Sequence, residues 1–217
     1  MPARIEQDAL GVPIEGATRA EVSLRAAVGR VGVRAAADPN LLVGGTLVAP
    51  WPDRGRWTLD RVGDTARFNL TLDRRHDLST AVWPDRSRVT VELAPFVSLT
   101  LRATLGEGTA TLDLAGLVLT EIAVQGGAGR VDLILPARGR LAAEVTSGTG
   151  EVTVRIPAGM AARIRVEGRR GSVDVVGDYQ PDNGVFTSPG YDTAAHRVDL
   201  TVRANVGRIT VLGVRSL

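Results

Sequence analysis

Apolar and polar residues alternate through much of the second half of the chain, and the alternation recurs at a fixed interval. The segment GGAGRVDLILP (126–136) is followed 21 residues later by SGTGEVTVRIP (147–157). The anchors of this interval are Ser87, Gly108, Gly129, Gly150, Gly171 and, after a longer gap of 36 residues, Gly207. A spacing near 20 residues is typical of stacked supersecondary units.

The positions after each anchor repeat their polarity. The second and fourth positions are apolar in every unit, and the position between them is polar. These two columns are Val89, Ala110, Val131, Val152, Val173, Ile209 and Val91, Leu112, Leu133, Val154, Val175, Val211. Because successive side chains of a strand point to opposite faces, the pattern predicts one half-buried strand in each unit. A further apolar column, Leu101, Ile122, Ala143, Ile164 and Leu200, predicts a second strand.

Equivalent residues recur at this interval because they stack on one another. We therefore predict an all-β fold, a right-handed parallel β-solenoid of 21-residue rungs. A β-sandwich is the alternative, but it has no reason to keep columns at a constant spacing. Residues 1–217 are predicted to form a single domain, with an irregular β-rich capping part (1–85) and a repeat part (86–217) that carries an insertion at 178–194. Within the cap, residues 22–33 resemble a degenerate rung anchored at Gly29.

Composition excludes several kinds of chemistry. The chain has no cysteine, so disulfides, zinc–thiolate sites and thiol catalysis are excluded. All 26 basic residues are arginine, which excludes Schiff-base lysines and the lysine of a phosphate loop. A net charge of +2 argues against nucleic-acid binding, although Arg163, Arg165, Arg169 and Arg170 could form a patch. We find no apolar run long enough to span a membrane and no signal peptide, so we expect a cytoplasmic chain that a partner could hold at the inner membrane face.

The sequence motifs that could indicate catalysis or ligand binding do not support either. Each glycine cluster leads into a strand rather than a helix, unlike a phosphate loop. GGAGRVD is similar to the calcium-binding repeat of β-rolls, but its aspartate falls one position late. The two histidines, His76 and His196, are far apart in the sequence, and there is no G-x-S-x-G motif. The sequence therefore predicts no enzyme, no metal and no cofactor.

The insertion DYQPDNGVFTSPGYDTA (178–194) contains both tyrosines of the chain and one of its three phenylalanines. Tyr179, Phe186 and Tyr191 are therefore the candidate partner-binding residues. One interpretation is a protruding loop whose aromatic side chains contact another protein. The other, which we prefer, is a local cluster that folds the loop back onto the last rungs and covers their edge.

The rung segments GRVDLILP, GEVTVRIP and GSVDVVG, followed by FTSPGYD (186–192) and HRVDLTVRANVGRITVLG, resemble the toastrack family of bacterial envelope-stress proteins. That family includes the C-terminal module of LiaF-type regulators of the response to cell-wall antibiotics. AAVGRVGV and LLVGGTL resemble the N-terminal cap of some members, so the resemblance covers residues 20–213. It implies a non-enzymatic β-solenoid that senses or scaffolds, often near a membrane or a signalling module.

We therefore predict a non-catalytic protein-binding or scaffolding module in a bacterial envelope-stress or signalling context. Self-association by strand addition is predicted at residues 206–213, taken as the open C-terminal end of the stack. The alternative is an adhesin-like or carbohydrate-binding surface protein. The outward columns argue against it, because they carry Thr, Asp, Arg and Glu rather than aromatic platforms.

Overall fold

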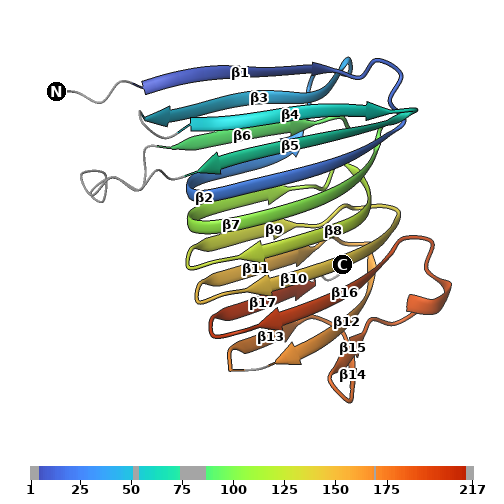
Figure 1. Ribbon diagram of the computed structural model, residues 1–217. Helices are drawn as coiled ribbons and strands as arrows, with labels where there is room; N and C mark the ends of the chain where they lie inside the picture. Colours follow the sequence, from blue (N-terminus) through green and yellow to red (C-terminus); the bar gives the residue numbers. More distant parts are fainter. Residues whose placement is uncertain (1–4, 51–53, 74–86, 169, 214–217) are drawn as a thin grey trace.

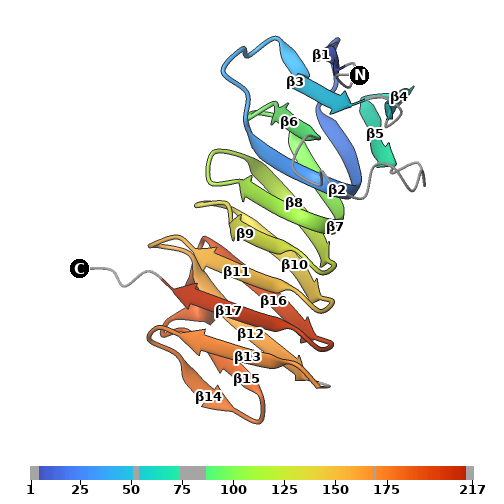
Figure 2. The same ribbon diagram turned by 90° about the vertical axis from the view of Figure 1, so that its left-hand side faces the viewer.

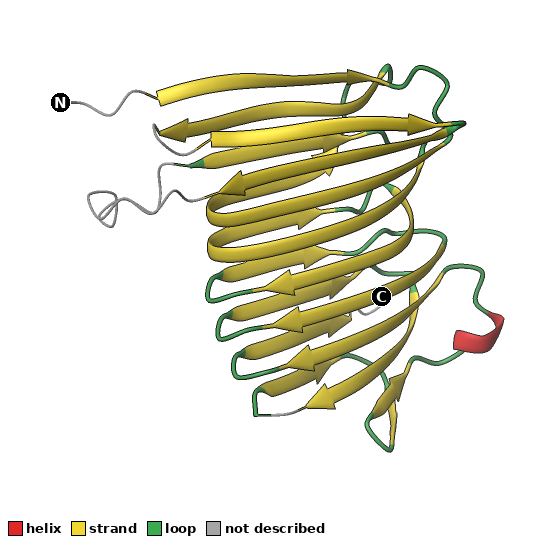
Figure 3. Ribbon diagram, in the orientation of Figure 1, coloured by secondary structure: helices red, strands yellow, loops and turns green. Residues whose placement is uncertain are grey.

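The computed structural model describes residues 5–50, 54–73, 87–168 and 170–213, with only the backbone described at 5–7, 49, 50, 54 and 73. The described chain is almost entirely β-structure, with one 3-10 turn, η3 (Tyr191–Thr193), in the insertion. Rungs of two strands are stacked along one axis (Figure 1, Figure 3). The all-β solenoid predicted from the repeat is confirmed.

Each rung contributes one strand to each of two facing layers, which we call the first and second sheets (Figure 2). The first sheet runs in the spatial order β4 (Arg54–Val62), β5 (Thr65–Asp73), the first half of β2 (Arg19–Ala35), the first half of β7 (Ser98–Asp113), β8 (Val118–Gly126), β10 (Arg140–Ser147), β16 (Arg197–Ala204), β12 (Ala161–Gly168), β15 (Val185–Thr187) and β14 (Gln180–Asp182). The second runs in the order β1 (Ile5–Pro13), β3 (Leu41–Pro50), β6 (Arg88–Leu93), the second halves of β2 and β7, β9 (Arg130–Ile134), β11 (Glu151–Ile156), β17 (Arg208–Gly213) and β13 (Ser172–Val176).

The strand register reproduces the predicted columns. Val131 lies between Ala110 and Val152 in the second sheet, so each partner is 21 residues from the next. All three side chains point inward and are buried. Inward Val, Leu, Ile and Ala side chains form one continuous core between the sheets, since narrow aliphatic side chains suit facing strands.

The order of the rungs in space differs from their order in the chain. The last rung, β16–β17, lies inside the stack, between β10–β11 and β12–β13. Leu200 therefore pairs with Ala143 on one side and with Ile164 on the other. The prediction that a strand is added at residues 206–213 is wrong, because β17 lies inside the sheet and already has a partner strand on both edges. The open end of the stack is β12–β13 with the β14–β15 hairpin.

The N-terminal part is interleaved in the same way. β2 lies between β7 and a rung made of β5 and β6, and Gly29 pairs with Gly108 as the column of anchors predicts. The rung of β5 and β6 contains residues on both sides of position 85, and the division of the chain there stays a prediction. The antiparallel pair β1–β3 and the antiparallel hairpin β4–β5 complete this end of the two sheets. Trp51, Trp83 and His76 lie outside the described residues.

The anchor glycines stack directly on one another. A Cβ at Gly150 would lie 1.9 Å from the carbonyl oxygen of Gly129, and a Cβ at Gly207 would lie 1.9 Å from that of Gly150. A Cβ at Gly171 would lie 2.4 Å from the carbonyl oxygen of Gly207. These four glycines do not have positive φ, so the close approach of backbones, rather than a left-handed conformation, requires glycine there.

Candidate functional site at the C-terminal end of the stack

The insertion folds back onto the last rungs. Strand β15 pairs antiparallel with β12 through Arg163–Arg165, and β14 pairs antiparallel with β15. The hairpin thus extends the first sheet beyond the last complete rung, at the bottom of the stack in Figure 1. As preferred from the sequence, the loop folds back onto the last rungs, but it covers only their edge in the first sheet.

Tyr191 holds the insertion against the outer face of the first sheet. Its side chain is only 4% exposed, and the guanidinium carbon of Arg163 lies 4.2 Å from its ring centroid. Arg163 also donates to a carboxylate oxygen of Asp192 at 2.9 Å, so one arginine contacts two residues of the turn. Burial raises the pKa of Tyr191 to about 12, and hydrogen bonding to the Asp199 carboxylate and its negative charge act in the same direction. These contacts act as a clamp between η3 and strands β12 and β16.

Tyr179 occupies space that an interrupted apolar column provides. Leu93, Leu114, Leu135 and Ile156 follow one another at 21-residue intervals and are all buried. The next two positions of the column are Gly177 and Gly213. A Cβ there would lie 2.5 Å from Cε2 and 2.3 Å from the phenol oxygen of Tyr179, respectively. The glycines therefore make room for this ring, and burial raises the pKa of Tyr179.

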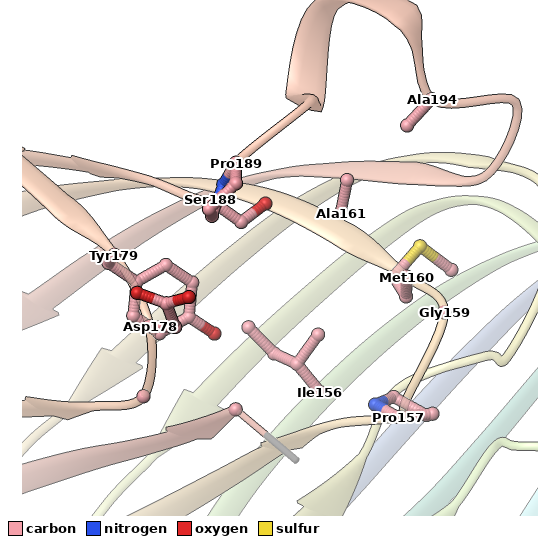
Figure 4. A pocket seen from close by; sticks show the side chains of 12 residues that line it. Ile156, Pro157, Gly159, Met160, Ala161, Asp178, Tyr179, Ser188, Pro189 and Ala194 are labelled. Carbon is pink, nitrogen blue, oxygen red and sulfur yellow. The ribbon is translucent and has the colours of Figure 1, made fainter. Parts of the chain in front are cut away.

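An open groove of about 700 Å³ lies beside Tyr179 (Figure 4). It is lined by the turn that follows β11, by the chain that leaves β13 and by the end of the insertion; the main side chains are Ile156, Pro157, Met160, Tyr179, Ser188 and Pro189. Gly177 and Gly213, the two glycines that end this column, are among the residues that line the groove.

Phe186, the third predicted residue, is half-buried on β15 and pairs with Ile164 of β12. The structure thus places Tyr179, Phe186 and Tyr191 on one insertion, but gives each a separate packing site. Their role in binding a partner stays a prediction.

Strand β13 is the open edge of the second sheet. Among the described residues it pairs with β17 alone. Its inward side chains, Val173 and Val175, are half-exposed, whereas their column equivalents Val152 and Val154 are buried. Val176, at the end of the strand, is 55% exposed. The sequence does not reveal this edge, because the repeated columns do not say which rung is terminal.

The described residues assemble no metal-binding cluster. No group of three or more His, Cys, Asp or Glu side chains in the described ranges could hold a metal ion. The Nδ1 atom of His196 accepts a hydrogen bond from the backbone N–H of Gly139 at 3.2 Å, which gives this histidine a structural partner. In the described part of the chain, no helix has the length and apolar character needed to cross a membrane.

The outer faces carry ion pairs between neighbouring rungs. Arg102 pairs with Glu121 at 3.0 Å, and Arg130 pairs with Glu151 at 3.0 Å. Arg203 of β16 contacts Glu144 of β10 and Glu167 of β12, and so links the inserted rung to both neighbours. Because these arginines have acidic partners on adjacent strands, the faces have mixed charge rather than a continuous basic surface.

Comparison with known families assigns the chain. The model of the N-terminal domain of toast_rack, DUF2154, matches residues 2–155, which is most of the sequence. The chain belongs to the toast_rack family. The resemblance inferred from the rung motifs is therefore confirmed at the family level, while the specific likeness of this toast_rack protein to LiaF-type regulators stays a prediction.

One solved structure shares the fold of this chain. The toast_rack chain is similar to a "putative cell adhesion protein" from Clostridium sporogenes ATCC 15579, with a TM-score of 0.85, 18% identity, and coverage of 97% of this chain and 100% of that one. A "putative adhesin" from Bacteroides fragilis NCTC 9343 matches with a TM-score of 0.39 and 12% identity, over 96% of this chain and 97% of that one. At such identities the first match shows a shared fold. No curated protein matches the chain.

Proposed function

We propose that this toast_rack protein is a non-catalytic module that binds or scaffolds another protein through the C-terminal end of its stack. The supporting observation is the incomplete last level of the fold. The first sheet continues past its last rung with β15 and β14, whereas the second sheet stops at β13. Half-exposed apolar side chains at such an end favour a contact with another polypeptide.

A bacterial envelope-stress or signalling context belongs to the same proposal. It rests on the family and on the rung motifs. In this context the protein works in the cytoplasm, and its partner holds it at the inner face of the membrane.

An adhesin-like or carbohydrate-binding surface protein is the second candidate, favoured by the structural likeness to the cell adhesion protein of Clostridium sporogenes. One outward row of side chains argues against a carbohydrate platform. The outward positions Asp113, Ile134 and Arg155 on three adjacent strands include no aromatic side chain.

A binding experiment with two arms distinguishes the candidates. The intact chain is immobilised and exposed to membrane and soluble fractions of the native organism, and separately to an array of bacterial and host glycans. A protein that is captured, purified and shown to bind stoichiometrically by calorimetry supports the proposed function. Saturable glycan binding without such a protein contradicts it and supports the second candidate.

A further inference from the structure

The geometry points to a slot for one extended strand of a partner polypeptide, on the free edge of β13. This inference rests on the proposed function and names the binding surface and the chemistry of its occupant. Three features of the described residues carry it: the direction of free backbone groups, the half-exposed inward side chains and the charges at the two ends of the strand.

The free backbone groups follow from the register of β13. The backbone N–H of Ser172 donates to the carbonyl of Gly207 in β17 at 3.1 Å, and Ser172 pairs with Arg208. In a parallel ladder alternate residues bond to the same neighbour, so Ser172, Asp174 and Val176 face β17. The N–H and C=O groups of Val173 and Val175 therefore point toward the open edge, where an added strand would find two donors and two acceptors.

The side chains around this edge require a partner that is apolar at alternate positions. Val173 and Val175 face inward and are half-exposed, and Val166 and Phe186 of the first sheet are also only partly buried. At the opposite edge of the second sheet, Leu10 of β1 points inward and is buried. The C-terminal edge therefore lacks the cover that the N-terminal edge has, and inward apolar residues of a partner strand would supply it.

The shape of this end admits a single strand rather than the flat edge of a second copy. The β14–β15 hairpin projects beyond β13 in the first sheet (Figure 1), so it would meet a second molecule before two β13 edges could pair. The hairpin's own edge is unsuited to pairing, because β14 contains Pro181 and Asp182 and is exposed throughout.

Charge at the two ends of the slot orients the occupant. Exposed Arg170 precedes β13, and exposed Asp178 follows it. The strand already added at this end, β15 on β12, is antiparallel, and antiparallel pairing is slightly more stable per residue. We therefore assign an antiparallel segment with a basic residue at its N-terminal end beside Asp178, two alternating apolar residues opposite Val175 and Val173, and an acidic residue beside Arg170.

A designed peptide tests this assignment. The probe is the fluorescein-labelled peptide RGTVTVTGE, whose valines would lie opposite Val175 and Val173, and binding to the intact chain is followed by anisotropy. The control peptide RGVTVTVGE places its valines at the outward positions instead. We expect saturable binding of the probe and binding of the control weaker by about tenfold, which corresponds to about 1.4 kcal/mol. Equal binding of the two peptides, or no saturable binding of the probe, would overturn the assignment.

Two variants test the edge itself. Val175→Pro removes a donor that faces the open edge and spares the ladder to β17, and it should weaken probe binding about tenfold while the far-UV circular dichroism is unchanged. Arg170→Glu combined with Asp178→Arg, both at exposed positions, should instead prefer the charge-reversed peptide EGTVTVTGR. An unchanged preference in this double variant contradicts the assigned orientation, even if the proline variant fails to fold.

Sedimentation analysis tests the remaining candidate occupant of the edge, which is a second copy of this chain. A wild-type dimer that becomes a monomer in Val175→Pro would assign the edge to a second copy and overturn the partner-strand assignment. The proposed function fails on different grounds, when the intact chain captures no protein at all. A captured protein that binds wild type and Val175→Pro equally would leave the function standing and remove the slot.

Discussion

Replacing Gly150 with alanine tests whether the period of the fold depends on contact between stacked backbones. The new Cβ would lie 1.9 Å from the carbonyl oxygen of Gly129 and 2.9 Å from that of Ala128. Neither oxygen belongs to a flexible side chain. Backbone hydrogen bonds connect Gly150 to both neighbouring rungs: its N–H donates to the carbonyl of Gly127 at 2.9 Å, and its carbonyl accepts from the N–H of Arg208 at 3.1 Å. The overlap can be relieved only by separating rungs that hydrogen bonds hold together.

We expect this substitution to destabilise the protein by about 3 kcal/mol, the upper part of the range for overpacked sites. For a chain of this length that loss lowers Tm by about 6–12 °C. The matched control is Gly168→Ala in β12, where no atom lies within 4 Å of the added Cβ and φ is not positive. The control should be neutral, or more stable by about 0.5 kcal/mol because the unfolded chain loses freedom.

Equilibrium unfolding in urea, followed by far-UV circular dichroism with a check of reversibility, measures both variants. The slope of the transition should not change, because the surface exposed on unfolding stays the same. A loss below about 1 kcal/mol for Gly150→Ala, or losses of equal size in the two variants, would refute the view that backbone contact requires glycine in this column.

Three further predictions concern the insertion and the inserted rung. The raised pKa of Tyr191 contributes stability that is fully present below pH 10 and is lost as pH rises toward 12, because the unfolded phenol ionises first; in Tyr191→Phe, urea unfolding should lose most of this pH dependence and keep only the part that the raised pKa of Tyr179 contributes, and an undiminished dependence would contradict the clamp. Arg203→Ala should cost only about 0.5–1 kcal/mol at low salt and less at 1 M NaCl, because its ion pairs are exposed; a larger, salt-independent loss by the same assay would contradict this. A disulfide should form between cysteines introduced at Thr153 and Thr210, because these residues are paired on adjacent strands. It should not form between cysteines at Thr153 and Asp174, which are two strands or about 9.6 Å apart. Non-reducing electrophoresis detects the disulfide without interference, since the chain has no cysteine of its own.

The sequence alone predicts the composition of each rung. Columns at a 21-residue interval identify which side chains are buried, and the pairs Val131–Val152 and Ile122–Ala143 lie side by side as expected. Alternation is informative here because every rung contributes the same two strands to one core. The irregular first half was less predictable, because its antiparallel strand pairs leave no repeated column and only the rung anchored at Gly29 resembles the others.

The order of the rungs could not be predicted from the columns. Residues that occupy one column are equivalent, and any two rungs can be neighbours without changing which side chains meet. Val152 packs against Val131 on one side and Ile209 on the other, although Val173 would have fitted the same place. The error about residues 206–213 has this cause, and it concealed the open edge of β13.

The length of the insertion is the feature of the sequence that indicates the order of the rungs in space. Consecutive rungs need only a short turn, as residues 157–160 between β11 and β12 show. To place β16 between β10 and β12, the chain must leave β13, pass around the terminal rung and return to the gap, and residues 177–196 make this connection. Tyr191 clamps that path to the outer face of the first sheet, and Tyr179 fills the space above Gly177 and Gly213. The aromatic residues therefore have a structural task in the connection, and the edge that the connection leaves uncovered is where another strand can still pair.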